Sequence, residues 1–190
     1  MKLWRSLIGR LQKLGIMVYG YVSMADRDEE HFDVCGDPQL QGRRPFHSVK
    51  AEIDVYMEEL GIDGIFTDDV PHNGINKENV LAVTKYVTDT CGLKAIHNPG
   101  MMSLDIDLVQ AAWRSCYREG VDPGDAAPLE EWPDVPRSKW VMILHHVSPS
   151  RWLEFAMQSR DRGYGAFYAT DGGWETYPTY MRRMLQSVLA

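Results

Sequence analysis

Hydrophobic and polar positions follow two alternating patterns along this chain. Stretches with apolar residues three or four positions apart are typical of amphipathic helices, whereas short apolar runs are typical of buried strands. The predicted helices span residues 2–14, 48–60, 76–91, 150–162 and 177–189. The predicted strands span residues 16–22, 61–70, 93–97, 106–112, 140–144 and 165–170, and 106–112 is the weakest of them. This alternation predicts an α/β fold with a parallel sheet and right-handed crossovers.

An open sheet and a closed (β/α) barrel both fit this order of elements. A closed eight-stranded barrel typically needs about 250 residues, whereas this chain has 190 residues and six predicted strands. We therefore predict a TIM-barrel-like parallel sheet with about six of eight strands. Residues 1–190 would form a single domain that lacks the N-terminal strands, because the first helix leads directly into the first strand.

Composition and charge narrow the possible functions. Hydrophobic residues make up 44% of the chain, which is enough for a substantial core. The chain has 20 basic and 27 acidic residues, for a net charge of -7, and the basic residues are scattered. Because phosphate binding needs a basic face, nucleic acid is not an expected partner. The six Trp and nine Tyr residues can stack on sugars as well as fill a core.

The cysteines and the apolar segments exclude further classes of protein. Cys35, Cys91 and Cys116 are odd in number and widely separated, which argues against a disulfide scaffold and a zinc ribbon. No apolar run approaches the roughly 20 residues of a membrane span. Basic residues interrupt the first helix at helical spacing, so the N-terminus does not have the pattern of a signal peptide.

The strand 61–70 carries two adjacent carboxylates, Asp68 and Asp69, near its C-terminal end. Barrel enzymes present catalytic groups at this end of their strands. Successive strand side chains point to opposite faces, so we expect one carboxylate to enter the mouth and the other to support it. The structural alternative is a pair that caps the following turn or binds an arginine.

Three other predicted strand exits also carry polar residues. His97 to Gly100, His145-His146 and Thr170-Asp171 follow or end their strands. Asn98 could bind a substrate hydroxyl and His97 could donate to a nearby carboxylate, although an Asn-Pro-Gly turn alone also ends a strand. Imidazole and carboxylate suit zinc or iron, but no His-x-His or H-E-x-x-H spacing appears. We therefore predict no metal and no cofactor.

Two aromatic positions are candidates for contact with a sugar ring. Tyr21 lies near the end of the first predicted strand, and Trp174 lies in the glycine-containing and aromatic segment 172–180. Flat rings of this kind could form an apolar platform for a pyranose. A packing cluster at the start of the last helix is an equally consistent interpretation of segment 172–180.

Taken together, the motifs resemble the spherulation-specific family 4 (spherulin-like) glycoside hydrolases, and the similarity covers nearly the whole chain. The matching segments are Gly20 to Val22, Gly42 to Pro45 with Val49 to Tyr56, Gly61 to Val70, Asn98 to Gly100, and Tyr168 to Asp171. The most specific of them is the G-I-F-x-D-D/E element. The resemblance implies a (β/α) barrel that acts on α-1,4-linked galactosamine or N-acetylgalactosamine polymers, in a secreted or cell-surface protein.

The sequence differs from the family pattern at three places. Asp69 stands where the family more commonly has Glu, which shortens the side chain by one methylene. The family places a further Glu at the exit of the strand after Asn-Pro-Gly, where this chain has Trp113, and Glu119 lies beyond the predicted strand. The two N-terminal barrel strands of the family have no counterpart, so a missing segment or a homo-oligomer would cover the open strands.

These observations lead to one leading hypothesis and two alternatives. In the first, the chain is a glycoside hydrolase of an amino-sugar polysaccharide, with Asp68 as the interior carboxylate and Asp69 as the acid or its support. The substrate-binding candidates are Tyr21, His97, Asn98, His145, Asp171 and Trp174. The alternatives are a non-catalytic glycan-binding or structural module, and a metal-dependent hydrolase that uses His97, His145 or His146.

Overall fold

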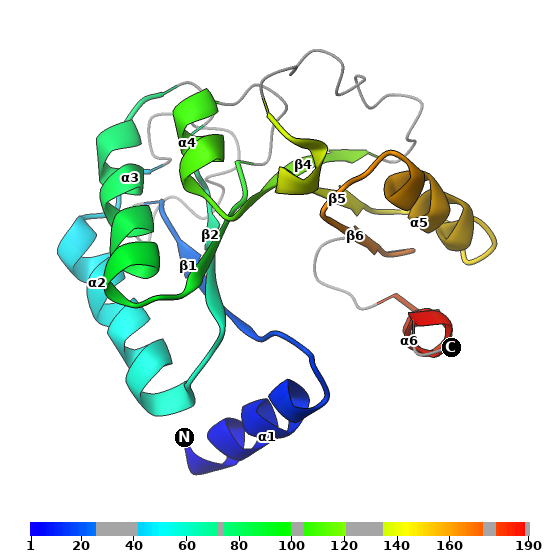
Figure 1. Ribbon diagram of the computed structural model, residues 1–190, viewed down its shortest axis with the longest axis horizontal. Coiled ribbons are helices and arrows are strands. Elements are labelled where there is room, and N and C mark those ends of the chain that lie inside the picture. The colour runs from blue at the N-terminus through cyan, green and yellow to red at the C-terminus, as the bar shows by residue number, and fades with distance from the viewer. Residues whose placement is uncertain (26–41, 72–73, 100–104, 121–134, 173–177, 189–190) are drawn as a thin grey trace. The chain divides into compact units, whose positions relative to one another are not determined.

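The computed structural model describes residues 1–25, 42–71, 74–99, 105–120, 135–172 and 178–188 (Figure 1). The chain forms two compact units, Met1–Ser115 and Cys116–Ala190. The prediction of a single domain over residues 1–190 stays a prediction.

The first unit is built on parallel strands. They are β1 (Tyr19–Ser23), β2 (Gly64–Asp68), β3 (Lys94–His97) and the beginning of β4 (Arg114–Gly120). β1 pairs with β2 so that Ser23 lies beside Asp68, and β2 pairs with β3 so that Thr67 lies beside His97. β4 enters the ladder where Arg114 pairs with Ile96. Because all these pairings are parallel, the C-terminal ends of β1, β2 and β3 lie at one edge.

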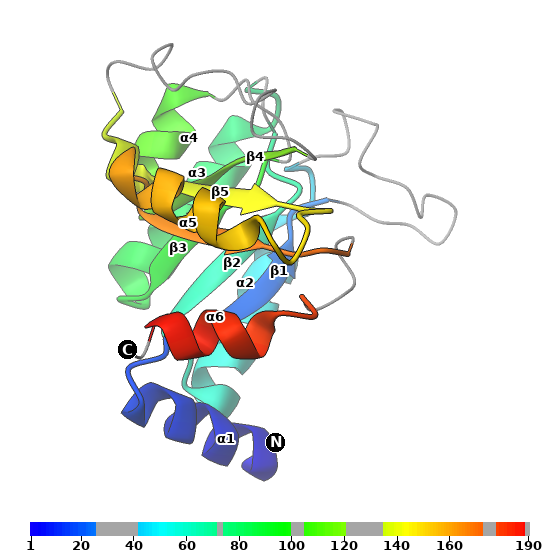
Figure 2. The same cartoon turned by 90° about the vertical axis from the view of Figure 1, so that its right-hand side faces the viewer.

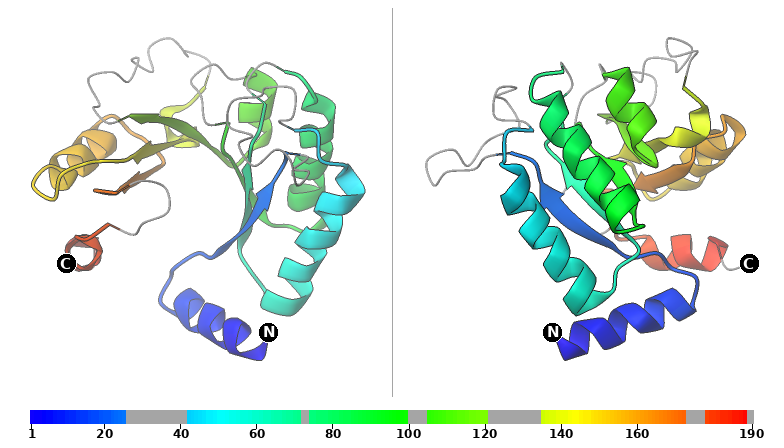
Figure 3. Two further views of the ribbon diagram at one scale, coloured as in Figure 1. Left: turned by 180° about the vertical axis from the view of Figure 1, so that it is seen from behind. Right: turned by 60° about the vertical axis from the view of Figure 1, so that its left-hand side comes forward.

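Two long helices cover one face of these strands (Figure 3). α2 (Phe46–Val55) continues into the π-helix η2 (Tyr56–Leu60), and α3 (Lys77–Lys85) continues into the π-helix η3 (Tyr86–Thr90). Their buried residues pack on the strands in one core that includes Val22, Val49, Ile53, Ile65, Val80, Val83, Val87 and Ala95. Burial of each Val or Ile stabilises the fold by roughly 1.5–3 kcal/mol.

The N-terminal helix α1 (Lys2–Lys13) lies beyond the N-terminal end of β1 (Figure 2). Ile8 is its one buried residue. Gln12 Nε2 donates to the carbonyl of Gly61 at 2.8 Å, and Arg5 Nη1 donates to the carbonyl of Glu58 at 3.2 Å. These bonds attach α1 to the end of the α2–η2 helix.

The second unit contains the parallel pair β5 (Trp140–Leu144) and β6 (Ala166–Ala169). Its helices are the short 3₁₀ helix η6 (Arg137–Lys139), α5 (Trp152–Asp161) and α6 (Met181–Val188). Trp152 stacks on Tyr180 with ring centroids 5.9 Å apart, and both rings are buried. The aromatic pair therefore links α5 to the segment that leads into α6.

The structure confirms the α/β class, and within each unit the strands of the described residues follow the chain order. It corrects the strand that we predicted over residues 106–112, which is instead the helix α4 (Ile106–Ala111). The Asp105 side chain accepts a hydrogen bond from the Asp107 amide at 3.0 Å and so caps this helix. β4 begins only after it, at Arg114.

The structure also corrects the start of the second helix. α2 begins at Phe46, directly after Pro45, rather than at Ser48. The Ser48 hydroxyl makes no cap and instead accepts from Arg44 Nε at 3.3 Å. No helix in the described part of the chain is long and apolar enough to cross a membrane.

Candidate functional site

The alternation of side chains along β1 and β2 separates a helix-covered face from a face on the opposite side. Val22 and Thr67 are buried toward α2 and α3, with 0% and 1% of their surface exposed. Their neighbours Tyr21 and Asp68 therefore point the other way. Tyr21 stacks on Phe66 with centroids 6.2 Å apart. We call the side that carries Tyr21, Phe66 and Asp68 the site face.

Asp68 receives hydrogen bonds from both neighbouring strands. Tyr21 Oη donates to Asp68 Oδ2 at 2.7 Å, and Asn98 Nδ2 donates to Asp68 Oδ1 at 2.9 Å. The backbone amide of Asp69 also donates to Asp68 Oδ1, at 2.9 Å. Three donors thus orient a carboxylate that is only partly buried at the end of β2. The structure brings together the predicted residues Tyr21, Asp68 and Asn98.

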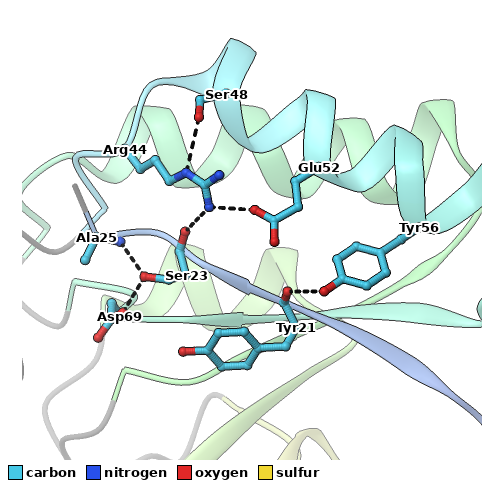
Figure 4. Close-up of polar contacts among 8 residues, drawn as sticks. All are labelled: Tyr21, Ser23, Ala25, Arg44, Ser48, Glu52, Tyr56 and Asp69. Carbon is cyan, nitrogen blue, oxygen red and sulfur yellow. Dashed lines mark hydrogen bonds and ion pairs between the residues drawn. The ribbon is translucent and has the colours of Figure 1, made fainter. Parts of the chain in front are cut away.

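Asp69 occupies a different environment from Asp68 although the two residues are adjacent. Its φ angle is 55°, in the left-handed region that non-glycine residues rarely adopt, and 6% of its surface is exposed. Asp69 Oδ2 accepts from Ser23 Oγ at 2.6 Å (Figure 4), and Ser23 Oγ accepts from the Ala25 amide at 3.1 Å. The carboxylate of Asp69 is therefore bound to the exit of β1.

His97 lies on the helix-covered face, away from Tyr21 and Asp68, and its contact with substrate stays a prediction. The residue is 1% exposed, and its Nε2 lies 2.9 Å from Thr84 Oγ1 on α3. The Thr84 hydroxyl already donates to the carbonyl of Val80 at 2.8 Å, so it accepts from His97 and Nε2 carries the proton. Thr67, which is the partner of His97 on β2, points to the same face. Because successive residues along a strand point to opposite faces, Asn98 points to the site face.

The remaining candidates belong to the second unit. Asp171 Oδ1 accepts from the Thr179 amide at 2.8 Å, and Asp171 Oδ2 accepts from the Thr179 hydroxyl. These bonds lower the pKa of Asp171, and they tie it to the segment before α6. Burial and the charge of the adjacent His146 lower the pKa of His145. Trp174 lies outside the described residues.

The residues that the structure describes contain no group of three His, Cys, Asp or Glu side chains that could hold a metal ion. His145 and His146 lie side by side, with ring centroids 5.9 Å apart. His97 is bonded to Thr84.

Sequence reasoning missed Ser23 and Arg44 as parts of this site. Ser23 stands two positions after Tyr21 on β1, so the strand period places both on the same face. Arg44 Nη1 donates to the carbonyl of Ser23 at 3.2 Å. The period of two could have identified Ser23, but no local pattern reports a contact between Arg44 and a strand end 21 residues earlier.

Comparison with known proteins extends the description of the fold. A search of curated proteins found no match. Among solved structures, the chain is similar to Sph3 of Aspergillus clavatus, crystallised in complex with GalNAc. The TM-score is 0.68 at 16% sequence identity, and the alignment covers 98% of this chain and 92% of that chain. The likeness shows a TIM-barrel-like fold. The sequence model of spherulation-specific family 4 matches residues 2–188, and the chain belongs to that family.

Proposed function

We propose that this protein is a glycoside hydrolase that cleaves a polysaccharide of galactosamine or N-acetylgalactosamine. The observation that carries the proposal is the carboxylate of Asp68, held on the site face at the end of β2 by Tyr21 and Asn98. The similar Aspergillus clavatus protein was crystallised with GalNAc, which supports an amino sugar as the ligand class.

Glycosidic cleavage needs one carboxylic acid to protonate the leaving oxygen and one carboxylate to act as nucleophile or base. Asp68 is the reacting carboxylate in this proposal, because it is partly exposed on the same face as the aromatic ring of Tyr21. Asp69 is the supporting acid, because it is buried and bonded to Ser23. Tyr21 and Asn98 keep Asp68 oriented and stand next to it as substrate contacts.

The corrected boundary of β4 changes the choice of a further acid. The family resemblance places a Glu at the exit of the strand after Asn-Pro-Gly, and β4 ends at Gly120, directly after Glu119. Trp113 precedes this strand. It stacks on Tyr19 at 6.3 Å between centroids, and Lys94 Nζ lies 4.5 Å from its ring centroid. We therefore assign the family's further acid to Glu119 and a packing role to Trp113.

The test compares wild type with Asp68→Asn on defined galactosamine and N-acetylgalactosamine oligomers, with release of reducing ends as the readout. Loss of the reacting carboxylate should lower kcat/KM by about 10³-fold or more. Glu119→Gln should also lower kcat strongly. Asp89→Asn is the matched control, because Asp89 is an exposed carboxylate bonded to its neighbour Thr88, and it should leave turnover unchanged.

A glycan-binding module without turnover is the second candidate function. It is favoured by the position of Asp69, which stands where the family more commonly has Glu, is buried and is bonded to Ser23. Isothermal titration calorimetry with the same oligomers distinguishes the binding module from the hydrolase. Binding without released reducing ends, and with equal affinity in Asp68→Asn, would replace the hydrolase by this second function.

A further inference from the structure

Arg44 lies at the point where β1 ends, and its guanidinium group has three partners (Figure 4). Nη1 donates to the carbonyl of Ser23 at 3.2 Å and pairs with Glu52 Oε2 at 2.7 Å. Nε donates to Ser48 Oγ at 3.3 Å. Two of these partners, Ser48 and Glu52, are on α2, so Arg44 connects the end of β1 to that helix.

The backbone around Arg44 is fixed as well. The Arg44 amide donates to the carbonyl of Met24 at 2.9 Å. Asn79 Nδ2, near the start of α3, donates to the carbonyls of Gly42 and Arg44, both at 2.7 Å. The segment from Gly42 to Arg44 is therefore held between β1 and α3.

Gly42 joins the same segment to Asp69. Its amide donates to the carbonyl of Asp69 at 3.1 Å. Its φ angle is +67°, and a Cβ at this position would lie 2.8 Å from Pro71 Cδ. Only glycine fits this approach without displacing its neighbours.

The strained conformation of Asp69 explains why such a scaffold is needed. A left-handed non-glycine residue persists only where the surrounding structure holds it, and such residues cluster at functional sites. The carbonyl of Asp69 is held by Gly42, and its carboxylate accepts from the Ser23 hydroxyl at 2.6 Å. The amide of Asp69 is bonded to Asp68 Oδ1 at 2.9 Å, so a shift of Asp69 also moves Asp68.

We infer that Arg44 is a positioning residue for the two carboxylates. It holds the carbonyl of Ser23, and this fixes the hydroxyl group that orients Asp69 and, through the Asp69 amide, the carboxylate of Asp68. The ion pair with Glu52 balances the guanidinium charge, so Arg44 acts through geometry. Its neighbour Arg43 is exposed and serves as the control. The effect of Arg44 on turnover rests on the proposed function, whereas its effect on Asp69 does not.

The test uses Arg44→Ala, Arg44→Lys and the matched control Arg43→Ala in the full chain. Amide hydrogen exchange at Ala25 and Gly42, the donors to Ser23 Oγ and to the Asp69 carbonyl, reports the scaffold directly. Arg44→Ala should raise both exchange rates about tenfold or more relative to an unaffected core amide such as Ile65. Arg43→Ala should change neither rate. Unchanged exchange in Arg44→Ala would overturn the inference.

Kinetics provide the second readout. A displacement of the carboxylates by a fraction of an ångström should lower kcat by about 10- to 100-fold in Arg44→Ala. KM should stay within about twofold, because Arg44 contacts no substrate in this scheme. Arg44→Lys should recover part of kcat, since an ammonium group can still bind the carbonyl of Ser23. If KM rose by a larger factor than kcat fell, Arg44 would act on substrate binding, and this result would also overturn the inference.

A double-mutant cycle tests the route through Ser23 without relying on Arg44→Ala, which removes several contacts at once. If Arg44 acts through Ser23, the double variant Ser23→Ala/Arg44→Lys should lose no more kcat than Ser23→Ala alone. Independent, multiplicative losses would refute this route. If the wild type released no reducing ends, the proposed function would fail, and the exchange rates would still decide whether Arg44 positions Asp69.

Discussion

The strand ends of the two units carry the same types of residue but use them differently. In the first unit, Asp68 accepts hydrogen bonds from Tyr21 and Asn98, which are 47 and 30 residues away in the sequence. In the second unit, Asp171 accepts from Thr179, only 8 residues away. An acid that collects donors from separate strands belongs to a convergent site. An acid that binds its own following segment holds that segment in place.

The largest difference is expected between Asn98→Ala and Asp171→Asn. Loss of the Asn98 amide frees one oxygen of Asp68 from its side-chain donor, and should lower kcat/KM by about 10- to 100-fold. Asp171→Asn should lower kcat/KM by less than about threefold and should instead lower the melting temperature, since it weakens the contact with Thr179. Release of reducing ends and thermal unfolding measure the two effects. Equal losses of turnover would remove the distinction between the strand ends.

Tyr21→Phe examines the donor on the other side of Asp68. The ring and its stacking on Phe66 remain, and the hydrogen bond to Asp68 Oδ2 is lost. We expect kcat to fall about tenfold with an unchanged melting temperature, because the side chain of Tyr21 is 47% exposed. As a control, Tyr164→Phe in the second unit should leave kcat unchanged. A fall in stability without a fall in kcat would make Tyr21 a packing residue.

Thr84→Val separates the two faces of the first unit. It leaves the buried His97 Nε2 proton without its acceptor on α3 and should lower the free energy of unfolding by about 1–3 kcal/mol. Because His97 lies on the helix-covered face, KM and kcat should stay within about twofold of wild type at temperatures where the variant is folded. Chemical denaturation measures the free energy of unfolding, and steady-state kinetics measure KM and kcat. A KM that rises severalfold would instead support the prediction that His97 contacts substrate.

The smallest expected effect is a loss of stability at high pH, and we expect it to be equal in the two units. Burial raises the pKa of Tyr19 and of Tyr180 to about 12, and their hydroxyl groups have no hydrogen-bond partner among the described residues. Between pH 10 and about 12 the unfolded chain loses these protons while the folded chain keeps them, so stability present below pH 10 is lost as the pH rises. Tyr19→Phe and Tyr180→Phe should each reduce this loss.

Denaturation curves at pH 7 and pH 11 measure the effect of the two tyrosines. At pH 7 each substitution should be neutral or stabilise the protein by up to about 1 kcal/mol, because it removes a buried hydroxyl group that lacks a partner. A destabilised Tyr19→Phe variant would show that this hydroxyl group has a partner. Similar changes in stability for the two variants would show that the two units differ at their strand ends and not in their buried tyrosines.

Most of the fold could be predicted because helix and strand periods are local properties. The strand over Trp140–Leu144 was predicted with its observed bounds. The segment from Ile106 to Ala112 was misread as a strand because its short apolar run fits both structures. The residue that distinguishes a helix from a strand here is Asp105, because its side chain can cap a helix at this position.

The candidate site could be predicted only in part. The strand exits identified Asp68 and Asn98, and the strand period applied to Thr67 and His97 would have placed His97 on the opposite face. The left-handed backbone of Asp69 could not be predicted, because nothing in Thr67-Asp68-Asp69-Val70 specifies it. It depends on contacts from Ser23 and Gly42, which are distant in the sequence.

The attachment of Ala25 and Gly42 has a consequence for the engineering of the carboxylate site. The chain leaves β1 at Ala25, whose amide is bonded to Ser23 Oγ, and returns at Gly42, whose amide is bonded to the carbonyl of Asp69. Residues 26–41 are thus inserted between two fixed anchor points. An engineer who wished to move Asp69 would therefore have to change Ser23 or Gly42, because these two residues hold its carboxylate and its carbonyl.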